Sequence, residues 1–450
     1  PSYPAVNFSS SVAAGEFNGD GVPDLAVGNE GDSSVSILLG NGDGTFRAAL
    51  DFPAGDEPVA VTVGEFNGDG RQDLVVANYF AYTVSVLLGN GDGTFQAPRT
   101  FFDSILPSAV AVGEFNGDGI PDLAVGHDRD SGGVTVFLGN GDGTFEPAQA
   151  PGESIPTGPW LTCVVVGEFN GDGLQDLAIP ERDLGWVRVL LGQGDGTFQL
   201  AGTFAVGYDP VFVAVGDFNG DGQQDLAAAA GDGAYLLPGN GDGTFQSSRN
   251  LGLGGRYVAP GDFNRDGVSD LIVVSTGGTR LLLGNGDGTF QTSPITYMAG
   301  SFPVALAVED LDGDGWADLA VVNLSSNDVS ILLNEGNPTS VTINQAFGQA
   351  DPTAGTTISF DVVFSGPVTG FSATDINLSA STVGGTLEPA VTGSGSVYTV
   401  SVTGMTGSGT VVARIPAAAA IDGSGGTTAA STSTDNTVTF INLSLIHISE

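Results

Sequence analysis

The segment Gly15-Glu16-Phe17-Asn18-Gly19-Asp20-Gly21 decides the fold of this chain, because it returns at regular intervals. The same seven residues or close variants of them begin again at Gly64, Gly113, Gly167, Gly216, Gly261 and Glu309. Successive copies lie 45–54 residues apart. Seven copies at a near-constant period indicate a repeat architecture, in which each copy contributes one supersecondary unit.

Each repeat contains four short runs that are typical of β-strands. In the second repeat, residues 59–63 precede the acidic segment, and residues 74–77, 84–88 and 94–96 follow it. These runs are rich in β-branched and aromatic residues and are bounded by Gly, Asn and Asp. No stretch has a sustained helical period. We therefore predict an all-β protein in which residues 1–336 form a seven-bladed β-propeller with four-stranded blades.

The two ends of the repeat region indicate how the ring closes. A hairpin phrase, Gly-Asn-Gly-Asp-Gly-Thr-Phe or its Gln variant, occurs six times for seven acidic segments. The seventh repeat lacks this phrase, whereas residues 2–7 precede the first repeat. We predict that residues 2–7 pair with residues 329–333 as the outer strand of the seventh blade, which would remove two exposed sheet edges. The hairpin phrase itself is interpreted as a turn, because Asn-Gly and Asp-Gly are preferred there.

The composition changes after the repeats. Residues 338–440 alternate Thr, Ser and Val, with strand candidates at 341–343, 357–364, 398–402, 409–413 and 436–440. This pattern predicts a small immunoglobulin-like β-sandwich, although the Cys…Trp…Cys core of that fold is absent. Residues 441–450 break the pattern and are set aside as a candidate non-native tail.

The net charge of the chain limits the classes of partner that it can bind. There are 52 acidic residues and 11 basic ones, all Arg, and the formal net charge is −41. This balance argues against nucleic-acid binding and favours cations. A single cysteine, Cys163, excludes an internal disulfide, and no apolar run reaches the roughly 18 residues of a membrane span. The start at Pro1, without Met or a secretory segment, predicts a piece of a longer multidomain chain.

The repeated acidic segments predict metal sites. In the first copy, oxygen-bearing side chains stand at positions 1, 3, 5 and 9 (Glu16, Asn18, Asp20 and Asp24), and Val22 at position 7 can offer its carbonyl. Hard oxygens at this density suit Ca²⁺, which takes six to eight of them, whereas softer metals would call for His or Cys. The corresponding residues of the other six loops are Glu65, Asn67, Asp69, Arg71, Asp73; Glu114, Asn116, Asp118, Ile120, Asp122; Glu168, Asn170, Asp172, Leu174, Asp176; Asp217, Asn219, Asp221, Gln223, Asp225; Asp262, Asn264, Asp266, Val268, Asp270; and Asp310, Asp312, Asp314, Trp316, Asp318.

The alternative is that these segments are ordinary turns, which also favour Asp, Asn and Gly. A turn does not require an Asp at the ninth position, which recurs in all seven copies, so we expect about seven Ca²⁺ sites. The last loop carries Asp312 where the other loops carry Asn, and we predict that this extra carboxylate makes it the tightest site. Four loops open with Glu, whose longer side chain should approach the ion differently.

Two phrases carry a resemblance to a known family: Glu-Phe-Asn-Gly-Asp-Gly-x-x-Asp-Leu and Leu-Gly-Asn-Gly-Asp-Gly-Thr-Phe. With them, residues 1–336 resemble the FG-GAP/VCBS repeat family, which is related in design to the propeller of integrin α-chains. The resemblance implies an extracellular, mostly bacterial, calcium-stabilised propeller used for adhesion or recognition. Residues 338–440 resemble the bacterial immunoglobulin-like repeats of surface proteins.

Three classes of function remain open. The first, which we favour, is a secreted or cell-surface recognition or adhesion module whose partner is an extracellular protein or glycan. The second is a lectin that uses loop aromatics such as Tyr79, Phe80 and Tyr82. The third is part of a calcium-dependent polysaccharide-degrading enzyme. We expect no catalytic activity, because the chain has no Lys and because His127, the sole His before the tail, has no Cys or second His near it in the sequence and is expected at the surface.

Overall fold

A computed structural model describes residues 1–442, except 5–7, 103–105, 129–131, 150–153, 276–277, 335, 337–338 and 423–427. The chain divides into two compact units, Pro1–Asn334 and Glu335–Glu450. The helices in the described residues are single 3₁₀ turns, η1 (Glu30–Asp32), η2 (Arg182–Leu184) and η3 (Ala373–Asp375). None of these described helices has the length and apolarity that crossing a membrane requires. Most of the predicted tail, from residue 443 onward, lies outside the described residues.

The first unit consists of four-stranded antiparallel sheets, one per repeat, and the described residues form seven of them. The first strands of the sheets are β2 (Ser9–Gly15), β6 (Pro58–Gly64), β10 (Pro107–Gly113), β14 (Val165–Gly167), β18 (Pro210–Gly216), β22 (Tyr257–Gly261) and β26 (Pro303–Glu309). The second strands are β3 (Asp24–Asn29), β7 (Asp73–Asn78), β11 (Asp122–His127), β15 (Asp176–Glu181), β19 (Asp225–Ala230), β23 (Asp270–Ser275) and β27 (Asp318–Asn323).

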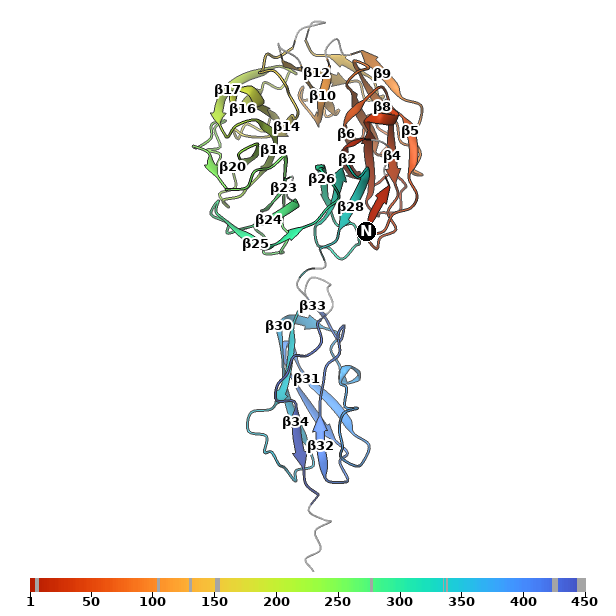
Figure 1. The fold of residues 1–450 in the computed structure, drawn as a ribbon, viewed down its shortest axis with the longest axis vertical. Helices are drawn as coiled ribbons and strands as arrows, with labels where there is room; N and C mark the ends of the chain where they lie inside the picture. Colours follow the sequence, from red (N-terminus) through yellow and green to blue (C-terminus); the bar gives the residue numbers. More distant parts are fainter. Residues whose placement is uncertain are drawn as a thin grey trace, which may run out of the picture. The chain divides into compact units, whose positions relative to one another are not determined.

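The remaining strands complete each sheet toward the outside. The third strands are β4 (Ser34–Leu38), β8 (Thr83–Leu87), β12 (Gly133–Gly139), β16 (Trp186–Gly192), β20 (Gly233–Leu237), β24 (Gly278–Gly284) and β28 (Asp328–Leu332). The fourth strands are β5 (Leu50–Pro53), β9 (Arg99–Phe102), β13 (Phe145–Pro147), β17 (Phe198–Ala205), β21 (Arg249–Asn250), β25 (Phe290–Tyr297) and β1 (Ser2–Pro4). We number the sheets 1 to 7 by repeat. In Figure 1 their first strands lie innermost and their fourth strands outermost.

Sheet 7 takes its fourth strand from the N-terminus of the chain. Strand β1 pairs antiparallel with β28, with Tyr3 opposite Val329 and Ser2 opposite Ser330. Residues 5–7, the rest of the segment predicted to close the ring, lie outside the described residues. The Tyr3 hydroxyl also accepts a hydrogen bond from the backbone N–H of Phe46 in repeat 1. The first and last repeats are therefore joined by strand pairing and by a side-chain contact.

The hydrophobic core of this unit is divided among the interfaces between sheets. Within the described residues, seven buried clusters each combine side chains of two successive sheets, and one of them joins sheet 7 to sheet 1. The second strands are buried along almost their whole length because they face a neighbouring sheet on each side. This burial explains their continuous apolar sequence, such as Leu-Val-Val-Ala in β7.

The prediction for the fourth strand of repeat 2 was wrong by a few residues. Residues 94–96 make only an isolated bridge, between Gly89 and Phe95, and the strand itself is β9. The ladder resumes only where Arg99 pairs with Val86, and the same interruption follows Phe46 in repeat 1 and Phe245 in repeat 5. In repeats 3, 4 and 6 the fourth strand does begin at the corresponding Phe.

The second unit is also built from strands. One sheet contains β29 (Val341–Gln345), β30 (Ile358–Thr369) and β31 (Glu388–Thr403), with β33 (Ile421–Asp422) paired to β30; a second pairs β32 (Gly409–Val412) with β34 (Thr437–Phe440). Alternate residues of β30 are buried, as expected for a sheet with one solvated face. Both sheets contribute to a single core, in which Phe360 and Val400 of one sheet cluster with Val438 of the other.

Candidate metal sites in the repeated acidic loops

The seven acidic loops occupy the same position in every sheet. Each loop connects the end of a first strand to the start of a second strand, and the Asp at loop position 9 is the first residue of that second strand. In repeat 1, Gly15 ends β2 and Asp24 begins β3. The regular spacing in the sequence thus becomes a regular placement at one end of each sheet.

The loop backbone depends on the left-handed conformation at positions 4 and 6. Gly19 and Gly21 both have φ of 79°, a region that glycine enters without steric cost. The sixth loop differs, because Arg265 stands at position 4 with φ of 55°. A residue with a long side chain is strained there, and this departure was not noticed in the sequence.

The residue at position 1 holds the loop backbone. In repeat 1, Glu16 Oε1 accepts hydrogen bonds from the backbone N–H groups of Asn18, Gly19 and Asp20. The loops that open with Asp use both oxygens instead: Asp310 Oδ1 accepts from Gly313 at 2.8 Å, and Oδ2 accepts from Gly315 at 2.8 Å. The Glu of repeat 1 therefore binds the loop backbone through one oxygen, whereas the approach of Glu to an ion stays a prediction.

Positions 3 and 5 also accept backbone hydrogen bonds. Asn18 Oδ1 accepts from the N–H of Asp20 at 2.9 Å, and Asp20 Oδ1 accepts from the N–H of Val22 at 2.9 Å. Such bonds from a side chain to the backbone two residues on are the local chemistry of Asx turns. The oxygens at positions 1, 3 and 5 consequently gather around one stretch of backbone, and the turn alternative accounts for part of the loop sequence.

The ninth-position Asp has a structural role that the sequence analysis missed. Asp24 is fully buried. Its Oδ2 accepts from the N–H of Phe17 at 2.9 Å, and its Oδ1 accepts from the N–H of Gly40, in the hairpin phrase, at 2.8 Å. The equivalent Asp residues of the other loops make the same two kinds of bond, with Asn334 in place of the hairpin glycine for Asp318. Each oxygen keeps a second lone pair, so these bonds leave the carboxylate able to bind an ion.

The electrostatics of the loops favour a cation. Burial raises the pKa of Asp24, and the nearby Asp20 and Glu16 carboxylates raise it further, against the lowering effect of the Phe17 and Gly40 N–H groups. In the seventh loop, burial followed by the charges of Asp312 and Asp314 raises the pKa of Asp318 to about 6. The negative charges of one loop therefore oppose one another, and a divalent ion would relieve this repulsion.

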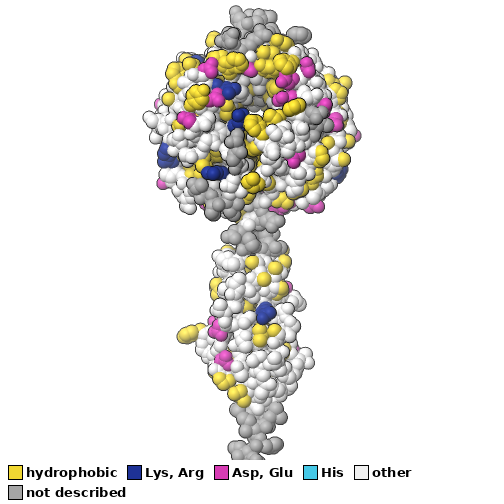
Figure 2. Space-filling model, viewed as in Figure 1, with side chains coloured by type: hydrophobic (Ala, Val, Ile, Leu, Met, Phe, Trp, Pro, Cys, Tyr) yellow, Lys and Arg dark blue, Asp and Glu magenta, His cyan; other side chains and the backbone are white. Residues whose placement is uncertain are grey.

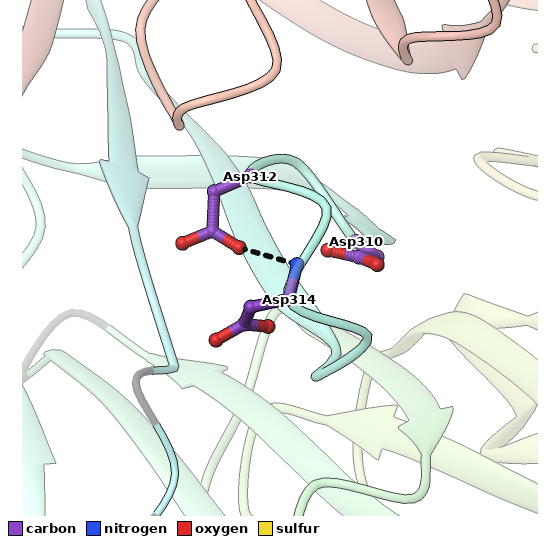
Figure 3. Close-up of side chains that lie close together, drawn as sticks. All are labelled: Asp310, Asp312 and Asp314. Carbon is purple, nitrogen blue, oxygen red and sulfur yellow. Dashed lines mark hydrogen bonds between the residues drawn. The ribbon is translucent and has the colours of Figure 1, made fainter. Parts of the chain in front are cut away.

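The seventh loop brings carboxylates closest together. Asp310, Asp312 and Asp314 each offer an oxygen within 4.8 Å of the others, and no other described group of three His, Cys, Asp or Glu residues does so. Figure 3 shows the three side chains on one turn of backbone, with Asp312 accepting from the N–H of Asp314 at 3.1 Å. The other loops carry Asn at position 3, which supplies an amide oxygen in place of the third carboxylate. This donor set fits a hard divalent cation.

An arginine from the sixth loop reaches this site. Arg265 Nη2 donates to the backbone oxygen of Asp314 at 3.2 Å, and its guanidinium carbon lies 4.8 Å from the centroid of the Trp316 ring. A positive charge thus stands beside the most acidic loop. The extra carboxylate of Asp312 and the charge of Arg265 act in opposite directions on the affinity of this loop for a cation.

Other residues of the repeats also have defined environments. Phe17 and its equivalents Phe66, Phe115, Phe169, Phe218 and Phe263 are buried and anchor the loops in the core, as does Leu311. In the hairpin phrases the Asp side chain accepts from the Thr two residues on, as Asp43 does from Thr45, and these bonds lower the pKa of Asp43. Cys163 is buried, and it lines a central cavity.

The expectation that His127 lies at the surface was wrong. His127 is fully buried at the end of β11, and its Nε2 lies 2.8 Å from Thr135 Oγ1. Sheets 1, 2 and 7 carry Asn29, Asn78 and Asn323 at the same strand end, each bonded to hydroxyl groups of the third strand. A residue type alone does not reveal burial, but the shared position in the repeat could have indicated it.

Sheets packed around a common centre, with an acidic loop at one end of each, define a β-propeller protein. A family model described as FG-GAP-like repeat matches residues 16–76, 65–125, 114–179, 169–228, 217–273 and 262–321. These matches span more than half of the chain, which therefore belongs to the FG-GAP-like repeat family. No curated protein sequence matches it.

Solved structures are similar in fold. BBS1N, in complex with ARL6DN, has 16% sequence identity and a TM-score of 0.51, with 73% of this chain and 93% of that chain covered. A lectin of Agrocybe aegerita, described as recognising non-reducing terminal N-acetylglucosamine, has 21% identity and a TM-score of 0.47, with 64% and 79% covered. At this identity, the likeness to BBS1N concerns the fold alone.

Proposed function

We propose that the chain is a calcium-stabilised, non-catalytic recognition or adhesion module that works outside the cell. In this proposal the seven sheets are the blades of a propeller closed by β1, and residues 338–440 form an immunoglobulin-like sandwich. The partner is an extracellular protein or a glycan. The observation that carries the proposal is the acidic loop at the same end of every sheet, with oxygens from positions 1, 3 and 5 around one stretch of backbone.

In this proposal, Ca²⁺ stabilises the connections between the strands of each sheet. The loop joins the first two strands of a sheet, and its ninth residue holds the following hairpin. Neutralising the loop carboxylates would stabilise that junction in each repeat. At the millimolar calcium found outside cells, even sites with a Kd of about 10⁻⁴–10⁻³ M would be largely filled.

A non-catalytic role agrees with the surroundings of the titratable groups. The loop carboxylates accept backbone hydrogen bonds, and the described histidine, His127, is fully buried. Burial also lowers the pKa of His127 to about 4, which leaves it a weak proton acceptor at neutral pH.

The test is a thermal unfolding series with Ca²⁺, Mg²⁺ or EDTA. We expect Ca²⁺ to raise the melting temperature of the whole chain and Mg²⁺ to raise it much less, because Mg²⁺ demands a tighter octahedral shell. A matched pair of variants separates the roles: Asp69→Asn removes a charge at position 5, whereas Asp92→Asn removes one from a hairpin turn. A chain that melts at the same temperature in EDTA and in Ca²⁺ would refute the proposal.

A lectin is the second candidate, favoured by large aromatic side chains at the surface. Phe80 and Tyr208 are exposed in the loops of the first unit. A glycan array with and without chelator distinguishes this candidate, because a lectin would retain defined sugars in the presence of calcium.

A further inference from the structure

The central cavity of the first unit has a charge opposite to that of the rest of the chain. It has a volume of about 370 Å³ and is lined by residues in or next to the first strands of the sheets, including Ser10, Ser108 and Thr162. Its lining contains two arginines, Arg182 and Arg256, and no Asp or Glu, although the chain has 52 acids and 11 Arg. Figure 2 shows dark-blue side chains at the border of a hollow in this unit. This volume falls within the range of small-ligand pockets, roughly 300–1,000 Å³.

One of the two arginines is available to a ligand. Arg182 forms an ion pair with Asp209, at 2.7 Å. Arg256 is exposed, and no described carboxylate lies within ion-pair distance of it. Its guanidinium carbon lies 4.8 Å from the centroid of the Phe302 ring. The stacking leaves the N–H groups of the guanidinium free to meet a planar anion.

Three exposed aromatic residues with positive φ lie close in the sequence to residues that line the cavity. Phe8, Trp160 and Phe302 have φ of 56°, 63° and 58°, and their exposed fractions are 57%, 44% and 37%. Phe8 lies two residues before Ser10, Trp160 two residues before Thr162 and Phe302 two residues before Val304, and the Phe302 ring contacts Arg256. Glu57 and Asp209 have the same conformation before their own first strands, so it belongs to the repeat, and the exposed rings are what a sugar face could contact.

A second hollow adjoins the first and supplies hydrogen-bond acceptors. It has a volume of about 290 Å³ and shares Ser10, Ser108 and Thr162 with the central cavity. Its lining includes Glu30 and Asp128. Asp128 Oδ2 accepts from the Tyr79 hydroxyl at 2.9 Å, whereas Oδ1 is buried without a partner in the described residues. These carboxylates repel an anion but accept hydroxyl groups, which would orient a ligand that carries both.

We propose that the cavity entrance binds a sugar with a carboxylate group, such as a terminal uronic acid. The proposal rests on the recognition function proposed above and gives its ligand class and its location. The sugar carboxylate pairs with Arg256 in a bidentate contact, the C–H face of the ring lies on the aromatic residues, and the hydroxyl groups point toward Asp128.

The test uses the full chain in Ca²⁺ and isothermal titration with three probes: a glucuronate-terminated disaccharide, its glucose-terminated analogue and a tri-glutamate peptide. We expect the glucuronate probe to bind at least about tenfold more tightly than the other two. Arg256→Gln should weaken its binding at least about tenfold, and so should Trp160→Gly, which keeps a backbone of positive φ without strain. Arg249→Gln, on the outer strand β21, should leave binding unchanged.

The outcomes are separable from those of the proposed function. Equal binding of the two disaccharides, equal binding of the peptide, or an unaltered Kd in Arg256→Gln overturns the proposal. The proposal is also overturned if none of the three probes binds. In that case a melting temperature that Ca²⁺ raises would still support the proposed function. A melting temperature that does not change with Ca²⁺ would instead count against the proposed function.

Discussion

Arg265 should weaken calcium binding at the seventh loop. Its Nη2 lies 3.2 Å from the backbone oxygen of Asp314, next to three carboxylates whose oxygens lie within 4.8 Å of one another. At a separation of about 7 Å, a single positive charge and a divalent ion repel by about 1 kcal/mol in a water-like dielectric. Replacing Arg265 with Asn, which tolerates positive φ, should therefore lower the Kd of this loop for Ca²⁺ about fivefold.

The assay can address this single loop among seven. Trp316 is at position 7 of the seventh loop, where the other loops carry residues that are not Trp. Luminescence of bound Tb³⁺, excited through Trp316, should report on that loop, and Ca²⁺ competition then gives its affinity. Trp316→Phe should abolish most of the signal and so verifies its origin.

Two further variants test the electrostatic reasoning. Arg265→Lys keeps the charge and should leave the Kd near that of the natural chain, whereas Arg249→Gln removes a charge from an outer strand. The effect of Arg265→Asn should also shrink at high salt, because exposed charges are screened. If Arg265→Asn and Arg265→Lys bind Ca²⁺ equally well, the charge of Arg265 has no bearing on the site and the reasoning fails.

Further predictions concern stability. In EDTA, the contribution of Asp318 to stability should fall as pH rises from about 4 to 6, because its raised pKa means that this carboxyl binds a proton more readily in the folded state than in the unfolded state; thermal melts of Asp318→Asn beside the natural chain isolate this contribution. Asp73→Ala leaves two buried N–H groups, those of Phe66 and Gly89, without an acceptor and should lower the free energy of unfolding by about 2–4 kcal/mol in urea titrations. A loss below about 0.5 kcal/mol would argue that Asp73 does not stabilise the connection between the loop and the hairpin. Because burial lowers the pKa of His127 to about 4, the folded state binds fewer protons and should lose up to about 3 kcal/mol as pH falls from 6.5 to 4. His127→Asn, the residue found at this position in other sheets, should remove that dependence, and an unchanged pH profile would count against it. Tyr3→Phe removes the acceptor of the Phe46 N–H and should cost about 1 kcal/mol, whereas an unaltered melting temperature would mean that this contact between sheet 7 and repeat 1 is negligible.

The repeat pattern predicted much of the fold because the turn and strand preferences of its residues act within each repeat. Gly19 and Gly21 favour a left-handed turn, and the apolar runs on either side favour strands. The sequence of each repeat therefore predicts one sheet. The fourth strand of repeat 2 was misplaced because its start is set by pairing with the neighbouring strand β8, where Arg99 lies opposite Val86, and local propensity does not describe such a pairing.

The sequence by itself determined which atoms are available at the candidate sites: the period, the oxygens at loop positions 1, 3, 5 and 9, and the excess of acid over Arg. Only the tertiary structure decided what those atoms meet. In the folded chain, Asp24 accepts a hydrogen bond from the N–H of Gly40, and Arg265 donates one to the seventh loop. Arg256 lies in the lining of a cavity to which every sheet contributes. The physical reason is that turn and strand preferences act over a few residues, whereas burial, charge pairing and cavity shape arise from segments that packing alone brings together.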